Sequence, residues 1–304
     1  MNGALHRLTL FQAMNYSSAL LFRLLLFFVI LTPGISSADM LIGGETSYVV
    51  QQGDCLISIG AKLGVGWQNI AKENRLDADV RLKIGTQLRV NTRRIVPKTL
   101  PDGIIINIPE GMLYFFENGE PMALPVGLGK SDLKWHTPLG RFTITAKAKD
   151  PTWHVPLSIQ EEMELNGLPV ETSVEPGPKN PLGKYAFKTS LGDIMIHATI
   201  WPTTVHQWRS HGCIRMLPEH MEKFFPLVAV GTRGEIIYEP VKLAQSSECR
   251  VFLEVHRDIY KRIDSLSGEV KKHLEKRGLS DQVDWNKINS IVNEKSGIAE
   301  DITL

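Results

Sequence analysis

The chain has 304 residues, of which 43% are hydrophobic and 22% charged, a composition typical of a folded soluble protein of about two domains. Its 34 basic and 33 acidic residues lack the cationic excess of nucleic-acid-binding proteins, which makes such a partner unexpected. The three cysteines, an odd number, leave at least one thiol free. Cys55 and Cys249 can pair or both stay reduced if Cys213 is the free one.

The N-terminus predicts a cleaved secretory signal peptide at residues 1–38. This segment has two arginines and no acidic residue, an apolar run at 24–31 and small residues at 36–38. The run is far shorter than the ~20 residues that span a bilayer, which disfavours the alternative of an uncleaved membrane anchor. Met14 is a second candidate start. Cleavage would lower the formal charge from +1 to −1 and leave no integral membrane span.

Residues 45–92 predict a small β-α-α-β module. A strand at 48–50 leads into a Gly-Asp turn, and apolar residues at helical spacing follow from Leu56 to Leu63, where Gly64 ends the helix. A second helix carries Trp67 and closes at Asn74. A strand at 88–90 completes the unit.

This module resembles the lysin-motif (LysM) domain. The family pattern is met by Tyr48, Val50, Gly53, Asp54, Leu56, Asn74, Leu76, Gly85, Leu88 and Val90. Cys55 stands where the family usually has threonine. The resemblance implies binding to N-acetylglucosamine-containing glycans, chiefly peptidoglycan. A structural cap that binds nothing is the alternative.

Beyond a Pro-interrupted linker at 92–101, short strands predict a mainly β domain at 101–240, either a sandwich or a barrel. Strands at 104–108 and 112–116 precede an Asn118-Gly119 hairpin turn, and later strands are expected up to 235–238. Residues 154–182, with five prolines, predict an irregular lid loop. It holds one short helix, which Ser158 opens with Glu161 as a capping box.

Residues 245–304 predict a separate, α-rich C-terminal extension. A strand at 251–255 precedes two helical patterns, of which the second is opened by Asp284. No motif there carries recognisable chemistry.

The chemistry concentrates in Ser210-His211-Gly212-Cys213-Ile214-Arg215, with His197 sixteen positions before the cysteine. Cationic neighbours and imidazoles lower a thiol pKa toward the nucleophilic thiolate, and Gly212 leaves backbone N–H groups open to a developing oxyanion. The pattern indicates acyl transfer through a thioester. An inert cysteine among chance histidines is the alternative.

The domain closely resembles the L,D-transpeptidase catalytic domain, the YkuD-type fold. Besides His197 and the Ser210–Arg215 motif, the family's upstream patterns are met by Thr137-Pro138-Leu139-Gly140 and by Gly177-Pro178-Lys179-Asn180-Pro181-Leu182-Gly183. The resemblance implies that Cys213 is the nucleophile and His197 the base. It also implies that the Ala198 carbonyl orients the His197 ring.

The remaining motif residues have supporting roles in this interpretation. His211 supports the site, and the backbone N–H groups of Gly212 and Cys213 are the oxyanion donors. Arg215 holds a substrate carboxylate or, alternatively, makes a local ion pair. Ser210 orients His211 or shapes the turn.

Aromatic residues between the two histidines leave one further choice open. Trp201, with Trp208 and His206, either lines the acceptor side of the substrate site or packs into the fold.

A metal site is the main rival interpretation, because His197, His206, His211 and His220 fall within 24 residues. Their spacings of nine, five and nine residues fit no zinc pattern, so neither a metal nor a cofactor is expected.

The predicted reaction joins peptidoglycan stem peptides in the periplasm. Cys213 attacks meso-diaminopimelate in a tetrapeptide stem, D-alanine leaves, and an amine resolves the thioester into a 3→3 crosslink or a link to a lysine of an outer-membrane protein. Two alternatives are open: a hydrolase that uses the same thioester, and a non-catalytic wall-binding protein.

Overall fold

The computed structural model describes residues 39–304, so the predicted signal peptide lies outside the described residues. Within that range no helix is long and apolar enough to cross a membrane. Four short elements complete the described chain: β1 (Leu41–Ile42), β4 (Arg94–Ile95), and the 3₁₀ turns η1 (Leu133–Trp135) and η2 (Pro202–Thr204).

The N-terminal module has the predicted β-α-α-β order: β2 (Glu45–Val49), α1 (Leu56–Leu63), α2 (Trp67–Asn74) and β3 (Gln87–Asn91). The strands pair antiparallel with Tyr48 opposite Leu88. Gly64 ends α1 with a φ of 66°, the left-handed conformation that glycine adopts without steric cost.

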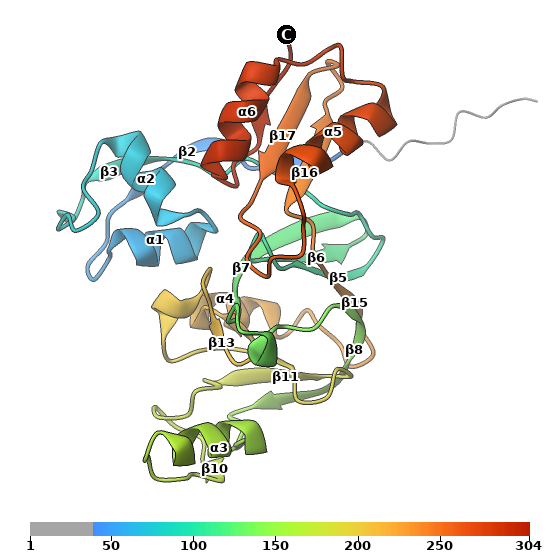
Figure 1. Ribbon diagram of the computed structural model, residues 1–304. Coiled ribbons are helices and arrows are strands. Elements are labelled where there is room, and N and C mark those ends of the chain that lie inside the picture. Colours follow the sequence, from blue (N-terminus) through green and yellow to red (C-terminus); the bar gives the residue numbers. More distant parts are fainter. Residues whose placement is uncertain (1–38) are drawn as a thin grey trace, which may run out of the picture. The chain divides into compact units, whose positions relative to one another are not determined.

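The central region is a nine-stranded sheet of β5 (Gly103–Asn107), β6 (Met112–Glu117), β7 (Glu120–Gly129), β8 (Gly140–Lys149), β11 (Tyr185–Thr189), β12 (Met195–His197), β13 (Trp208–Ser210), β14 (Ile214–Met216) and β15 (Arg233–Ile237). The strand order is β13-β7-β14-β12-β11-β8-β15-β5-β6. Because β6 also pairs with β7, eight of the strands close on themselves, and of the two predicted architectures the barrel is found (Figure 1).

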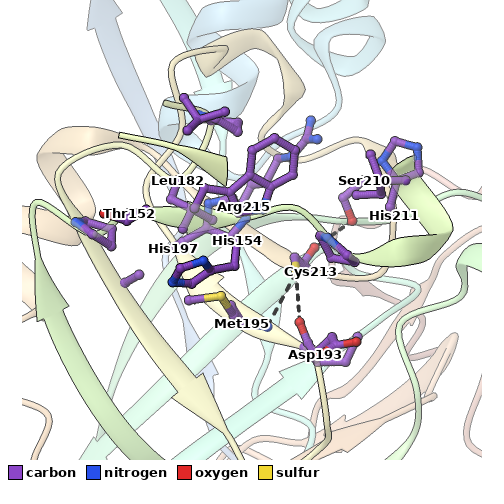
Figure 2. A pocket seen from close by; sticks show the side chains of 18 of the residues that line it. Thr152, His154, Leu182, Asp193, Met195, His197, Ser210, His211, Cys213 and Arg215 are labelled. Carbon is purple, nitrogen blue, oxygen red and sulfur yellow. Dashed lines mark hydrogen bonds between the residues drawn. The ribbon is translucent and has the colours of Figure 1, made fainter. Parts of the chain in front are cut away.

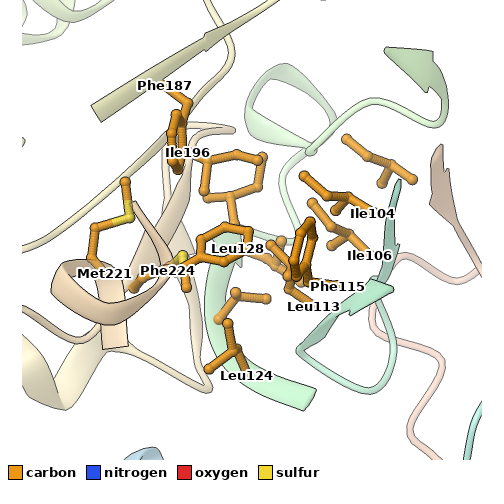
Figure 3. Close-up of a cluster of buried hydrophobic side chains, with 14 of the residues drawn as sticks. Ile104, Ile106, Leu113, Phe115, Leu124, Leu128, Phe187, Ile196, Met221 and Phe224 are labelled. Atoms are coloured by element: carbon orange, nitrogen blue, oxygen red, sulfur yellow. The ribbon is translucent and has the colours of Figure 1, made fainter. Parts of the chain in front are cut away.

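The interior of the barrel is apolar and holds the strands of the site in place (Figure 3). The rings of Phe115 and Phe187 each pack edge-on against Phe224 of α4 (Pro218–Phe224), with centroids 5.4 and 5.7 Å apart. Burial of each such side chain contributes about 1.5–3 kcal/mol. Ile196 of β12 and Ile214 of β14 are fully buried in the same cluster, so these two strands are firmly positioned.

The predicted lid consists of β9 (Trp153–His154), α3 (Leu157–Leu165) and β10 (Ser173–Val174), with β9 and β10 paired antiparallel. The predicted capping box is wrong. The helix begins one residue before Ser158, its N-cap is Pro156, and no side chain caps it. The Pro156 carbonyl instead accepts the N–H groups of Ile159 and Gln160, and the exposed Glu161 side chain lies 4.0 Å from Lys134 Nζ.

The C-terminal region contains the two predicted helices, α5 (Leu266–Arg277) and α6 (Trp285–Glu294), together with a sheet larger than expected. The strands β16 (Val241–Gln245), β17 (Val251–Val255) and β18 (Glu300–Asp301) form an antiparallel sheet in that order. Figure 1 shows β16 and β17 beside α5 and α6. Of these three strands, the sequence pattern predicts β17 alone. The apolar faces of α5 and α6 cover this sheet and form a second hydrophobic cluster.

Candidate active site

The register of two adjacent strands brings the motif residues together. The strands β12 and β14 run parallel, with Ile196 opposite Ile214 and His197 opposite Arg215. Successive side chains of a strand point to opposite faces, so the two isoleucines enter the core and His197 and Arg215 share the other face. Cys213 lies two residues before Arg215 and faces the same side.

That face borders a cavity of about 890 Å³ (Figure 2). Residues of β8, the lid helix α3, β11, β12 and the motif turn line it. The predicted site residues at its wall are His197, Trp201, Ser210, His211, Cys213 and Arg215.

The Cys213 thiol rests between two backbone groups. It donates a hydrogen bond to the Asp193 carbonyl at 3.5 Å and accepts one from the Met195 N–H at 3.4 Å (Figure 2). Burial raises the pKa of this thiol, and the Met195 N–H and the Arg215 guanidinium only partly oppose that effect. The cationic neighbours in the sequence predict a thiolate. In the structure burial outweighs them, and the resting cysteine is protonated at neutral pH.

His197 is buried and neutral. Its Nδ1 lies 2.5 Å from the Ala198 carbonyl, which accepts the Nδ1–H. Burial, together with the charge of Arg215, lowers the pKa of His197 to about 4. A neutral imidazole with its proton on Nδ1 keeps the Nε2 lone pair available, and it can therefore take a proton from a thiol.

The turn that carries the cysteine is held from inside by Ser210. The Ser210 hydroxyl donates to the Cys213 carbonyl at 2.6 Å and accepts the Gly212 N–H at 3.1 Å. Both bonds lie within the turn, which favours the turn-shaping alternative for Ser210. The second bond also occupies the Gly212 N–H, so of the two predicted oxyanion donors the Cys213 N–H remains.

His211 connects the motif to the lid. Its Nε2 lies 2.6 Å from Glu162 on α3, and Lys130 Nζ lies 3.1 Å from the same nitrogen and 3.4 Å from Glu162. Burial and the Lys130 charge lower the pKa of His211, so at neutral pH its Nε2–H donates to the carboxylate. The ring also packs edge-on against Trp135, with centroids 4.4 Å apart.

Arg215 has no carboxylate partner among residues 39–304. Its guanidinium is half-buried and lies 5.6 Å from the centre of the Trp201 ring. The alternative of a local ion pair is therefore not seen, and a cationic, partly desolvated group faces the cavity beside the thiol.

The other two residues considered for the acceptor side lie elsewhere. His206 Nδ1 approaches the Gly111 carbonyl, and Trp208 donates its indole N–H to the Ile108 carbonyl at 2.9 Å. Both contacts belong to the packing of the barrel. Only Trp201 of these three lines the cavity.

The four histidines named for a metal site do not form a metal-ligand group within residues 39–304. A different group in the described part of the chain has metal-ligand geometry: Glu110, Glu254 and His256. There the Lys242 ammonium lies 2.8 and 2.7 Å from the two carboxylates and supplies the positive charge.

Comparison with known proteins assigns these features to a family. The L,D-transpeptidase catalytic domain (YkuD) matches residues 101–241, and the LysM domain matches residues 48–91. The chain is 30% identical over 233 residues to a probable L,D-transpeptidase, YbiS of Escherichia coli (strain K12), with 74% of each chain covered. The chain belongs to the L,D-transpeptidase family.

A further relative of this L,D-transpeptidase supports the same family. It is 29% identical over 299 residues to the probable L,D-transpeptidase ErfK/SrfK of Salmonella typhimurium, covering 91% of this chain and 95% of the relative. A solved structure, L,D-transpeptidase 3 from Mycobacterium tuberculosis, is 14% identical with a TM-score of 0.36 over 52% of this chain and 76% of that one. At that level the structural likeness adds nothing to the assignment.

Several residues at the L,D-transpeptidase site were not predicted from the sequence. Glu162, Lys130 and Trp135 contact His211, and Asp193 bonds the thiol through its backbone. None of them belongs to the local motif. Their only sequence signal is that Glu162 lies in the predicted lid.

Proposed function

We propose that this L,D-transpeptidase uses Cys213 to form a thioester with a peptidoglycan stem peptide and then transfers the acyl group to an amine. The observation that carries the proposal is the shared face of Cys213, His197 and Arg215. It combines a nucleophile, a neutral base and an unpaired guanidinium at one wall of a large cavity.

Arg215 is suited to bind a carboxylate of the stem peptide. A guanidinium binds a carboxylate through two parallel, charge-assisted hydrogen bonds. Because no carboxylate among the described residues occupies Arg215, substrate can bind there without breaking an internal ion pair. This contact would place the carbonyl of meso-diaminopimelate near Cys213.

Acylation starts from the neutral thiol of Cys213 and the neutral imidazole of His197. The Cys213 thiol turns from Asp193, gives its proton to His197 Nε2 and forms a bond to the carbonyl carbon. The Cys213 N–H stabilises the oxyanion. As the tetrahedral intermediate collapses, the C–N bond breaks, imidazolium returns the proton to the leaving nitrogen, and D-alanine departs.

Deacylation reverses these roles. An acceptor amine attacks the thioester carbonyl, its proton passes to His197, and the C–S bond breaks to regenerate the thiol. The acceptor is an amine of a second stem, which gives a 3→3 crosslink, or a lysine of an envelope protein. No metal or cofactor enters either step.

The remaining regions fit an enzyme of the periplasm. Cleavage after residue 38 would release the protein there, and the LysM module would bind glycan strands. Tethering to the polymer raises the local concentration of the enzyme near stem peptides. Residues 101–240 would carry catalysis, and 245–304 form a third region.

Mass spectrometry of muropeptides from sacculi incubated with the purified protein tests the proposal. Wild type is expected to produce 3→3 crosslinks or peptide-linked lysines, and Cys213→Ala neither. Cys249→Ala is the matched control, because this thiol is exposed and free. Crosslinks made by Cys213→Ala would overturn the cysteine mechanism, whereas tripeptides alone from wild type would identify a hydrolase.

A further inference from the structure

Tyr260 comes from outside the matched catalytic region, 101–241, yet its side chain belongs to the core of the barrel. It lies between β17 and α5 and is 7% exposed. Its ring stacks on His136, with centroids 3.7 Å apart and planes 6° from parallel. The chain therefore returns from the C-terminal sheet to place one tyrosine beside the catalytic domain's Thr137 loop.

The Tyr260 hydroxyl is the first member of a hydrogen-bonded relay. It donates to the Gly129 carbonyl at 2.9 Å and accepts the Thr137 N–H at 3.1 Å. The Thr137 hydroxyl in turn accepts the Gly129 N–H at 3.0 Å and donates to the Gly212 carbonyl at 2.9 Å. Each of the two hydroxyl groups donates to one carbonyl and accepts from one N–H, so all four hydrogen bonds can form at the same time.

The last bond of this relay reaches the peptide unit of the nucleophile. The Gly212 carbonyl and the Cys213 N–H belong to one planar trans peptide and point in opposite directions. A bond that fixes the carbonyl therefore fixes the direction of the N–H. It also polarises the amide and strengthens that N–H as a donor.

The segment that carries Tyr260 is itself anchored. The Tyr238 hydroxyl donates to Asp258 at 2.5 Å and accepts the Tyr260 N–H at 2.8 Å. The Asp258 carboxylate also accepts the N–H groups of Arg262 and Ile263, each at 2.9 Å. These bonds hold the backbone on both sides of Tyr260, so its hydroxyl has a defined position.

We propose that Tyr260 is a positioning residue for the Cys213 N–H that stabilises the oxyanion, and that the segment after β17 thereby completes the active site. The inference rests on the proposed role of Cys213 as the nucleophile. It gives a function in catalysis to a part of the chain that carries no catalytic motif.

Two reactions of Cys213 separate positioning from a general structural role. Acylation by a carbapenem creates an oxyanion at the attacked carbonyl, whereas alkylation by iodoacetamide displaces iodide and needs no oxyanion donor. Tyr260→Phe keeps the ring and its stack on His136 but removes the hydroxyl. We expect it to slow acylation about tenfold, less than the ~10²–10³ lost with a whole donor, and to leave alkylation unchanged.

With a stem peptide the same variant is expected to lower kcat about tenfold at an unchanged KM, because the oxyanion exists only in the transition state. Tyr114→Phe is the matched control. It removes another buried tyrosine hydroxyl of the barrel, one that donates to Glu110 and has no contact with the relay. Its rates of acylation by the carbapenem and of alkylation by iodoacetamide should equal those of wild type.

The outcomes are distinct. Acylation of Tyr260→Phe at the wild-type rate overturns the inference, and so does an equal fall in acylation and alkylation, which indicates a general loss of structure. If wild type itself is not acylated at Cys213, the proposed function fails, and the inference fails with it. Acylation slowed in Tyr260→Phe alone, at normal alkylation, supports the inference.

Discussion

At the scale of single residues, the Cys213–His197 pair differs from a preformed ion pair. Burial raises the pKa of the thiol and lowers the pKa of the imidazole to about 4. Both shifts favour the neutral forms over the charged ones. The two residues therefore start as thiol and imidazole at neutral pH, and in the proposed mechanism the proton moves only when substrate is attacked.

The rate of alkylation of Cys213 by iodoacetamide should consequently keep rising from about pH 6 to about pH 9, roughly tenfold per pH unit. Only the thiolate reacts, and a thiol with a raised pKa is still largely protonated at the upper end. The measurement is the pseudo-first-order rate in Cys55→Ser/Cys249→Ser protein, which keeps Cys213 alone. A plateau below about pH 8 would instead indicate a thiolate–imidazolium pair.

At the scale of elements, the lid is attached to the motif by one polar cluster. Helix α3 has no buried residue, so packing alone holds it weakly. Glu162 is the α3 residue that bonds His211 and approaches Lys130. The lid therefore depends on this carboxylate for its position over the cavity.

Glu162→Gln should loosen the lid and raise KM for stem peptides about threefold to tenfold. A hydrogen bond to a charged group contributes about 1.5–3 kcal/mol, and solvent weakens this contribution for a partly exposed pair. Hydrogen exchange of residues 157–165 should become faster. Glu161→Gln is the control, because Glu161 is on the same helix, is 67% exposed and pairs loosely with Lys134 at 4.0 Å. Equal effects of the two substitutions would contradict the role of Glu162 in holding the lid.

At the scale of the whole molecule, a buried charge cluster joins regions that are distant in the sequence. Lys242 of β16 lies against Glu110, in the turn between β5 and β6, and against Glu254 of β17, with side chains 2%, 2% and 0% exposed. The cluster also bonds the backbone of Ile95 through both Lys242 and Glu254. The C-terminal sheet is thus tied to the barrel by charges that are costly to separate.

Lys242→Met should lower the free energy of unfolding by about 3–5 kcal/mol, because it leaves two carboxylates buried without their cation. Guanidinium unfolding at neutral pH measures this. Lys98→Met, which breaks the exposed pair with Glu235, should cost less than about 1 kcal/mol. A similar loss in both variants would contradict the role of the buried cluster.

The same cluster predicts how the difference in stability between wild type and Lys242→Met depends on pH. Burial would raise the pKa of Glu110, but Lys242, His256 and Arg94 lower it to about 2. A carboxyl with a lowered pKa stabilises the fold above its ordinary pKa, and this contribution is lost as the pH falls toward 2. Wild type and Lys242→Met should therefore approach each other in stability in acid.

Much of the fold could be predicted because its signals are local. The Asn118-Gly119 turn has positive φ angles of 53° and 84°, as that dipeptide favours, and helical spacing with Gly64 placed α1 correctly. The predicted capping box is wrong because another local signal, a proline, lies two residues earlier. A Ser-x-x-Glu pattern at Ser158 is present, but the helix begins at Leu157, and the carbonyl of its N-cap, Pro156, accepts the first bonds.

The sequence by itself determined which residues we propose for the chemistry: a cysteine, two histidines and an arginine at fixed spacing. Because alternate residues of a strand face the same side, it also indicated that several of them share one face. Only the tertiary structure decided their environment. It placed Glu162 against His211 across 49 residues of chain and Tyr260 against Gly129 across 131, which no local pattern encodes. It also decided that the thiol is protonated, because a pKa depends on the burial that folding imposes and not on neighbours in the sequence.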